Sequence, residues 1–453
     1  LPGRMGGMNL RSAARTAPAA YWASWSNALL VLRTRAPDVA AAARAELERA
    51  DGTAVACLQA ARASYELLQQ AGATDLPTWA ESHEGTRPVP LPPDGLDAMD
   101  FLRGWQCHAS SFLETNFLEQ QVKPSLDEPN KALLHSQATG PACAFLRAIP
   151  SEPAYTFRPE RLQNALRRRV RWPLTTTGQY CGRSCTHRLD SFGDRAAACP
   201  RSGRLRLRSR PIEQIWIRIL REAGIRLREN VYLRDTTLPN IDPADNRRIE
   251  IVATGLPAKK KDIPLAIDAT LVSPLHADGS PLDNAVSAPG TALRNAERGK
   301  RMTYPELVTS PFLRLYTVAT EIGGRQNRNA TDLLLYASHY RARNDPPVLR
   351  SASARAWQQR WQTMLSVTVQ DALVATLTED TFPLLDASHG YAPQPTDVWL
   401  DMANLPTTTT ARRAPDREAG STTDERANAT NEPTNATTHH ANERPDQHTG
   451  EPD

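Results

Sequence analysis

The sequence predicts an α+β protein in which a helical N-terminal region precedes a small α/β domain. Residues 1–150 contain segments rich in helix formers, with apolar residues three and four positions apart. Residues 225–272 instead carry short segments that alternate apolar and polar residues, as half-buried strands do. From about residue 404 the chain has almost no large apolar residue, so we expect residues 404–453 to form a disordered tail.

The helical region is expected to be a packing domain, with its clearest periodicity in APAAYWASWSNALLVL and DVAAAARAELERA. RPVPLPPDG at 87–95 splits it as a loop. The expected domain order is a helical region, an arginine-rich linker with a cysteine cluster, an α/β domain, a C-terminal helix and the tail. Their boundaries are 1–150, 151–205, 206–345, 346–403 and 404–453.

The α/β domain is expected to open with an amphipathic helix at 211–224. Pro211 suits the first turn of this helix, and Gly224 suits its C-terminal cap. Three strands, a helix, a fourth strand and a long closing helix should follow. We expect them at 225–233, 247–254, 264–272, 292–307, 311–324 and 353–377.

Composition limits the class of protein. With 453 residues, of which 40% are hydrophobic, the chain has room for two or three domains. No apolar run reaches the length of a membrane span, and no signal peptide opens the chain. Leu1 suggests a piece of a larger polyprotein. Three of the six cysteines are scattered and three are clustered, which favours a reducing, intracellular setting over a disulfide framework.

Positive charge gathers in residues 161–230, which hold 17 Arg, no Lys and 5 acidic residues, an excess of 12 positive charges. Such a block beside a cysteine cluster predicts a nucleic-acid partner. The alternative is a compositional bias, because the whole chain has 48 Arg and only 6 Lys. The candidate nucleic-acid contacts are Arg167, Arg168, Arg169, Arg171, Arg204, Arg206, Arg208 and Arg210.

The cysteine cluster lies in CGRSCTHRLDSFGDRAAAC, residues 181–199. Cys181 and Cys185 have the spacing of one side of a zinc knuckle, and Cys199 supplies a third thiolate. The fourth ligand is open. His187 is close to Cys185, and the carboxylates of two nearby residues could supply an oxygen instead, namely Asp190 and Asp194. The alternative is a turn without zinc, held together by packing.

Two acidic residues stand in the expected strands. Glu250 lies between Ile249 and Ile251, and Asp268 is likewise flanked by apolar residues, so each acid should point away from its neighbours. If the strands pair, both carboxylates meet at one edge of a sheet and can hold Mg²⁺. Lys300, in the next helix, could act on a bound phosphate. The alternative is the ordinary alternation of a half-buried strand.

The order of these motifs resembles the C-terminal region of non-LTR (LINE-type) retrotransposon reverse transcriptase polyproteins. There a cysteine–histidine knuckle precedes a restriction-enzyme-like endonuclease of the PD-(D/E)XK class. The resemblance covers the chain from near residue 1 to about 380. LPGRMGGMNLRSAARTAPAAYWASW resembles the segment after the polymerase thumb, and CGRSCTHRLDSFGDRAAACP resembles the knuckle.

The remaining motifs resemble parts of the endonuclease. RRIEIVATGLP and PLAIDATLVSP resemble its two acidic strands. NAERGKRMTYPEL resembles the helix that supplies the family's Lys and Tyr, and matches them with Lys300 and Tyr304. FLRLYTVATEIGG resembles the strand after it, where Glu321 is a further polar candidate.

The resemblance implies Mg²⁺-dependent nicking of target DNA, whose 3′-hydroxyl would prime reverse transcription. Glu250 and Asp268 would hold Mg²⁺, Lys300 would act at the phosphate and Tyr304 would help to position it. Two residues of the preceding helix could assist at the metal, Glu213 and Glu222. The knuckle implies Zn²⁺, the partners would be target DNA and element RNA, and the location would be intracellular and nuclear, with no membrane association.

Several departures from the family pattern leave a catalytically inactive nucleic-acid-binding remnant as the alternative function. The knuckle His falls at Arg195, which cannot coordinate zinc. Glu250 replaces an Asp, and the Lys two positions after the second acid is absent, so Lys300 or the adjacent Arg301 must take its role. The chain has no adjacent pair of aspartates, so polymerase activity would belong to a longer parent.

Overall fold

The structure is a computed structural model that describes residues 1–86, 104–174, 180–182, 185–255 and 263–378. The loop expected at 87–95, the tail expected at 404–453 and part of the region expected at 346–403 lie outside these residues. All the described residues belong to one compact unit. None of the helices in the described ranges has the length and apolar character that crossing a membrane requires.

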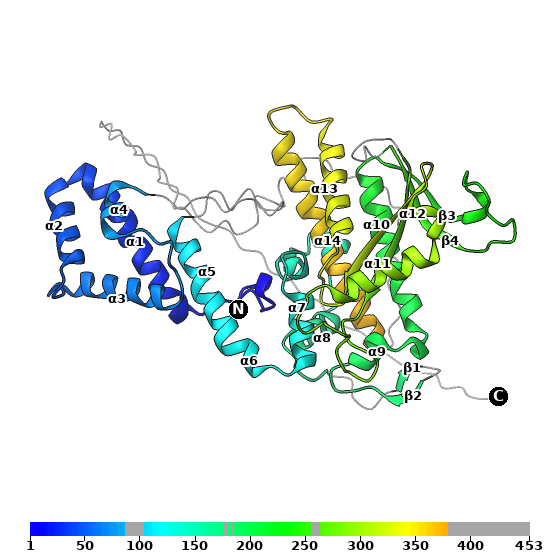
Figure 1. Cartoon of the computed structure of the whole chain (residues 1–453), viewed down its shortest axis with the longest axis horizontal. Coiled ribbons are helices and arrows are strands. Elements are labelled where there is room, and N and C mark those ends of the chain that lie inside the picture. The colour runs from blue at the N-terminus through cyan, green and yellow to red at the C-terminus, as the bar shows by residue number, and fades with distance from the viewer. Residues whose placement is uncertain (87–103, 175–179, 183–184, 256–262, 379–453) are drawn as a thin grey trace, which may run out of the picture. The chain divides into compact units, whose positions relative to one another are not determined.

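The N-terminal region is helical, as expected, and has a core of its own (Figure 1). Trp22 and Trp105 meet edge to face in this core, with ring centroids 5.6 Å apart. Side-chain caps fix two of the helix starts: Ser12 accepts from the backbone N–H of Arg15, and Thr78 forms a capping box with Glu81. The elements are η1 (Gly3–Met5), α1 (Ala13–Arg35), α2 (Pro37–Glu48), α3 (Ala56–Gln70), α4 (Trp79–Glu84) and α5 (Trp105–Phe117).

Short helical elements lead from this region to the α/β domain. They are η3 (Leu118–Val122), α6 (Lys123–Ser125), α7 (Glu128–Gln137), η4 (Pro141–Arg147), η5 (Pro153–Tyr155) and α8 (Pro159–Arg169). The segment with the clustered cysteines then forms a small antiparallel pair of strands and two short helical elements. These are β1 (Tyr180–Gly182), β2 (Cys185–Arg188), α9 (Asp194–Ala198) and η6 (Pro200–Ser202).

Helix α10 (Arg204–Glu222) opens the α/β domain, and its start differs from the expected one. We expected a start at Pro211, but the helix begins seven residues earlier and carries Pro211 inside it. Proline in a helix interior removes one backbone hydrogen bond. Here Pro211 and Ile212 are both buried in the core, so packing outweighs the local preference for a helix start. The expected end is confirmed, because Gly224 follows the helix with a left-handed φ of 79°.

The sheet has the order β3-β4-β5-β6, and its strands lie close to the four expected ranges. The first two pairs are antiparallel, whereas β5 and β6 are parallel and are connected through α11. The strands are β3 (Arg226–Tyr232), β4 (Arg248–Thr254), β5 (Leu265–Val272) and β6 (Arg314–Glu321), with η7 (Leu233–Asp235) after β3. Helices and sheet together make the chain an α+β protein, as predicted.

The helices that follow β5 differ in detail from the expected ones. The helix expected at 292–307 is α11 (Thr291–Thr303), and a second short helix, α12 (Pro305–Val308), begins at its proline. Helix α13 (Arg328–Ala342) was not expected. The closing helix is α14 (Arg350–Thr378), as predicted within a few residues.

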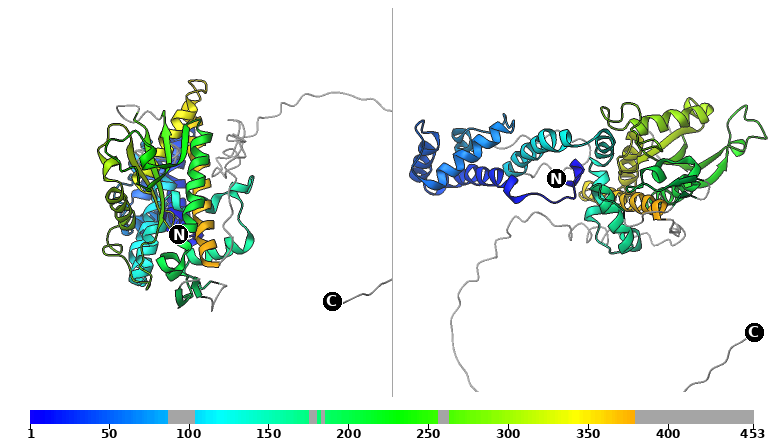
Figure 2. Two further views of the ribbon diagram at one scale, coloured as in Figure 1. Left: turned by 90° about the vertical axis from the view of Figure 1, so that its right-hand side faces the viewer. Right: turned by 90° about the horizontal axis from the view of Figure 1, so that it is seen from below.

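The two faces of the sheet belong to different cores. Ile251 and Ile267 pack into the main core, together with the apolar face of α10 and the tryptophans of α14, Trp357 and Trp361. Figures 1 and 2 show α10 beside the sheet, and α14 packs against α10. A smaller core on the other side holds residues such as Val252, Ala266, Tyr304 and Leu307, from β4, β5 and the α11–α12 segment. The helix that carries Lys300 is therefore fixed to the same strands as the acids.

Candidate functional site

The two acidic strands bring Glu250 and Asp268 together, as predicted. Ile251 of β4 faces Ile267 of β5 in the register, so the two acids occupy the next facing positions. A carboxylate oxygen of Glu250, Oε2, accepts a hydrogen bond from the backbone N–H of Ala269 at 2.7 Å. Asp268 is only 2% exposed. The strand pairing therefore produces two neighbouring carboxylates, one half-buried and one buried.

One part of the strand prediction is wrong. We expected Ile249 and Ile251 to lie on one face, but Ile249 packs in the smaller core and Ile251 in the main core. Asn230 of β3 lies at the corresponding point of the β3–β4 pair and has a left-handed φ of 53°. This conformation interrupts the regular alternation of the pair beside Glu250.

Helix α11 supplies the two other predicted residues. Lys300 Nζ lies 2.7 Å from Oδ1 and 2.8 Å from Oδ2 of Asp268. Lys300 and Tyr304 are four positions apart, so they share one side of the helix end. The Tyr304 hydroxyl donates to the carbonyl oxygen of Arg248 at 2.8 Å and thereby anchors α11 to β4. Arg301 is exposed, so Lys300 is the cation at the site.

Burial and mutual repulsion make the acids of this site hold their protons more tightly than free carboxyl groups do. Burial raises the pKa of Glu250, and the neighbouring charge of Asp268 raises it further. Burial also raises the pKa of Asp268, although Lys300 acts in the opposite direction. The pKa of Tyr304 rises to about 12 through burial and the charges of both acids. A divalent cation would relieve the repulsion between carboxylates that are this close.

Helix α10 carries Glu213 and Glu222, each of which we expected to assist at the metal. Burial raises the pKa of Glu213, and its charge in turn raises that of Glu250, so Glu213 lies near the two acids. Among the described residues, however, only the three cysteines form a group of three metal-ligating side chains that are mutually close. Glu222 lies away from the acids. It lies nine positions further along α10, which is two and a half turns and therefore the opposite side of the helix.

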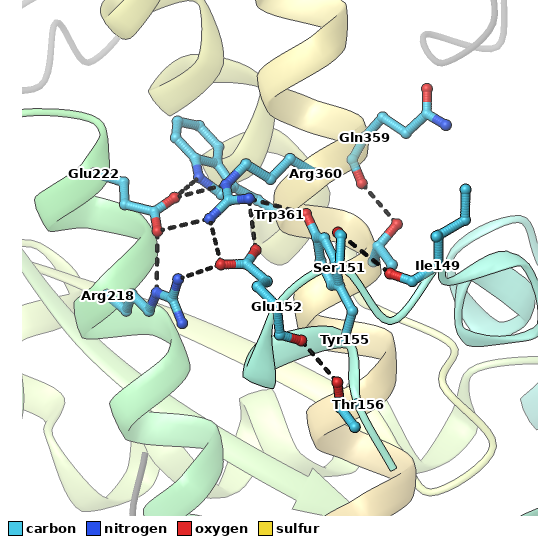
Figure 3. A network of polar contacts seen from close by, with 11 residues as sticks. Ile149, Ser151, Glu152, Tyr155, Thr156, Arg218, Glu222, Gln359, Arg360 and Trp361 are labelled. Atoms are coloured by element: carbon cyan, nitrogen blue, oxygen red, sulfur yellow. Dashed lines mark hydrogen bonds and ion pairs between the residues drawn. The ribbon is translucent and has the colours of Figure 1, made fainter. Parts of the chain in front are cut away.

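Glu222 instead belongs to a buried network of polar contacts (Figure 3). Arg218, Arg360 and Trp361 all donate to its carboxylate, and Trp361 Nε1 does so at 2.8 Å. Arg360 also pairs with Glu152, whose Oε1 lies 2.6 Å away. This network connects η5, α10 and α14, and no sequence motif indicated it.

Glu321 also lies apart from the acids. In the parallel β5–β6 register Thr317 faces Asp268, and Glu321 faces Val272. Four residues of strand span roughly 13 Å, which is too far for a shared metal ion. Burial raises the pKa of Glu321 to about 7, while Arg325 and a hydrogen bond with Ser136 act to lower it.

The three clustered cysteines also gather, and all three are free thiols. Their Sγ atoms lie within 4.8 Å of one another, and all three side chains are buried. The Sγ atoms of Cys185 and Cys199 are 3.8 Å apart. Gly182 makes this approach possible, because a Cβ at this position would lie 2.4 Å from the carbonyl oxygen of Ser202. The β1–β2 pair and the segment after α9 can therefore come into direct contact.

The three thiols are spaced as three of the four ligands of a tetrahedral zinc site would be. Zinc–sulfur bonds of about 2.3 Å at tetrahedral angles place two sulfurs about 3.8 Å apart, whereas a disulfide needs about 2.05 Å. His187 Nδ1 lies 3.8 Å from Cys185 Sγ, but His187 falls outside the group of mutually close ligand atoms. The extended β2 places Cys185 and His187 on the same side of the strand without a tight turn, but His187 does not lie close to all three thiols.

The two aspartates considered as oxygen ligands have other partners. Asp190 accepts from the backbone N–H groups of Phe192, Asp194 and Arg195, and so caps the start of α9. Asp194 pairs with Arg168 and Arg171, at 2.9 Å in each case. Neither carboxylate is available to complete a site with the cysteines.

The arginines predicted to contact nucleic acid divide into two groups. Arg168, Arg169 and Arg208 are buried, which corrects their assignment to a binding surface. Arg169 donates to backbone carbonyls that include Gly3 O at 2.8 Å, and Arg208 donates to Leu271 O at 3.0 Å. Burial lowers the pKa of Arg169 to about 10 and that of Arg208 to about 9. These guanidinium groups satisfy buried carbonyl oxygens and hold the fold together.

Of the remaining five arginines, Arg206 and Arg210 are exposed on α10. The other three are half-buried and bonded within the chain: Arg167 to Pro173 O, Arg171 to Asp194, and Arg204 to Thr376 O. Arg248 was not among the predicted contacts. It is exposed and lowers the pKa of Glu213 together with Arg210. Its position at the start of the acidic strand β4 was the available signal.

The comparisons with known proteins do not assign a family. No protein-family model matches the chain, and no curated protein matches it.

Proposed function

We propose that the α/β domain is a Mg²⁺-dependent endonuclease that nicks DNA. The observation that carries the proposal is the contact of Lys300 Nζ with both carboxylate oxygens of Asp268, beside Glu250. A phosphodiesterase needs carboxylates for a metal ion and a cation for the phosphate, and these three residues supply both. Their order on two strands and the following helix is the order that the PD-(D/E)XK resemblance implies.

Each residue would have its own role in the reaction. Bound Mg²⁺ supplies positive charge for a phosphate oxygen and makes a water molecule more acidic. Glu250 and Asp268 would hold the ion, with Glu213 as a third carboxylate near them. Lys300, which contacts Asp268, would stabilise the charge that develops at the phosphate. Tyr304 would keep α11 in register through its bond to Arg248 O.

Exposed arginines beside the acids support a nucleic-acid substrate. Arg210 and Arg248 both lie close enough to Glu213 to lower its pKa, and Arg206 stands one turn before Arg210 on α10. Cations at this position can bind phosphates that flank the scissile bond, and such binding weakens steeply with salt. In a retrotransposon protein the substrate would be target DNA, element RNA would be a second partner, and the location would be nuclear.

Nicking of supercoiled plasmid by the full chain tests this function, with Mg²⁺ or EDTA. The wild type should nick only with Mg²⁺, and Asp268→Asn should reduce the rate by at least about a hundredfold, since a lost metal ligand removes transition-state stabilisation of several kcal/mol. Glu321→Gln is the matched control, because it neutralises an equally buried acid outside the cluster. Equal rates for Asp268→Asn and wild type would refute the site. Salt-sensitive binding without nicking would instead support the catalytically inactive nucleic-acid-binding protein.

A further inference from the structure

Arg195 lies on α9, next to the segment that carries the third cysteine of the cluster. It lies four positions before Cys199, and the backbone N–H of Cys199 donates to Arg195 O at 2.8 Å. Arg195 and Cys199 therefore lie one turn apart, on α9 and directly after its end. Arg195 Nη1 donates to Ala277 O at 3.3 Å, and its Nε is buried without a hydrogen-bond partner among the described residues. The guanidinium lies close enough to the cluster for the charges of all three cysteines to act on it, and its Nε–H has no other partner within the described part of the chain.

Charge balance explains why an arginine is found there. Three thiolates and one divalent ion carry a net charge of −1, which is costly to bury without a partner. The guanidinium of Arg195 brings the total to zero, and the charges of Cys185, Cys199 and Cys181 all act on it. A monovalent soft ion would leave a net negative charge, and a fourth anionic ligand would do the same. The cluster with Arg195 is therefore matched to a divalent ion and three thiolates.

We propose that the cluster binds one zinc ion through Cys181, Cys185 and Cys199 alone, with Arg195 as the counter-charge and a solvent molecule in the fourth position. Guanidinium has no free lone pair, so Arg195 cannot be the fourth ligand. The site thus departs from the closed knuckle that the resemblance implies, and His187 is not a ligand. This inference does not depend on the nuclease proposal, because the acids and the cysteines are separate groups of residues.

X-ray absorption of the zinc-loaded full chain tests the ligand set directly. The expected result is one zinc per chain with three sulfur neighbours, one oxygen neighbour and no imidazole scattering. Arg195→His should add imidazole scattering, because it puts a ligand in the place of the counter-charge. His187→Ala should leave both the spectrum and the zinc dissociation constant unchanged.

Zinc affinity, measured by chelator competition, tests the role of Arg195. Loss of an outer partner of a ligand weakens metal binding about 10- to 100-fold, so we expect this effect for Arg195→Gln. Arg195→Lys keeps the charge and should remain close to wild type, and far-ultraviolet circular dichroism confirms that each variant is folded. The inference is overturned if His187→Ala weakens binding tenfold, if Arg195→Gln binds as tightly as wild type, or if the folded wild type binds no zinc.

Discussion

Glu321 allows a quantitative test of the electrostatics, because it is buried outside the acidic cluster. Its side chain is 2% exposed, and burial raises its pKa from 4.5 to about 7. One pKa unit corresponds to about 1.4 kcal/mol, so ionising Glu321 in the native state costs about 3 kcal/mol. Glutamine resembles the protonated acid in shape, so Glu321→Gln removes this cost.

The direction in which Glu321 changes stability with pH follows from proton binding. The native state holds the Glu321 proton more tightly than the unfolded state, so the stabilisation is complete below about pH 4.5 and is lost as the pH rises through about 7. The variant should therefore be more stable than wild type by about 3 kcal/mol at about pH 8, and equally stable near pH 4.

Urea unfolding at the two pH values measures this difference, followed by fluorescence of the buried tryptophans Trp216, Trp357 and Trp361. Glu306→Gln is the opposite control, because Arg247 lowers the pKa of Glu306, so this variant should lose stability at about pH 8. If Glu321→Gln and wild type lose stability in parallel as the pH rises, the reasoning about Glu321 is refuted.

Three further predictions concern the metal, the buried network and the surface. Mg²⁺ affinity, measured by calorimetry, should rise with pH above neutrality, because the raised pKa values of Glu250 and Asp268 mean that protons compete with the metal; a flat profile would contradict this. Arg360→Met should cost about 3 kcal/mol in urea unfolding, because it leaves Arg218 as the one arginine that pairs with the carboxylates of Glu222 and Glu152 in this network. A loss below about 1 kcal/mol would show that the network is not structural. Arg210 is exposed, so Arg210→Ala should lower the salt dependence of DNA binding by about one ion without loss of stability. Arg208 is buried, so Arg208→Ala should destabilise the fold. The reverse pattern would show that the exposure of the two residues is misassigned.

Local sequence patterns predicted most of the secondary structure. Short apolar segments bounded by turn residues were enough to predict the four strands of the β3–β6 sheet, although β5 and β6 are buried along most of their length. The short strands β1 and β2 were not predicted. Helix α13 had a local signal as well, since Asn327 caps its start by accepting from the N–H of Ala330. Pro211 shows the limit of such signals, because tertiary packing continued α10 through a residue that usually marks a helix start.

Residue patterns alone predicted the α+β class, the strands that carry Glu250 and Asp268, and the helix that carries Lys300. These follow from periodicity and order along the chain, which are local properties. The packing of distant segments sets which arginines face solvent, which side of α10 meets the acids, and that Lys300 reaches Asp268. Those outcomes depend on partners distant in sequence, such as Leu271 O for Arg208, and neither residue type nor net charge specifies them.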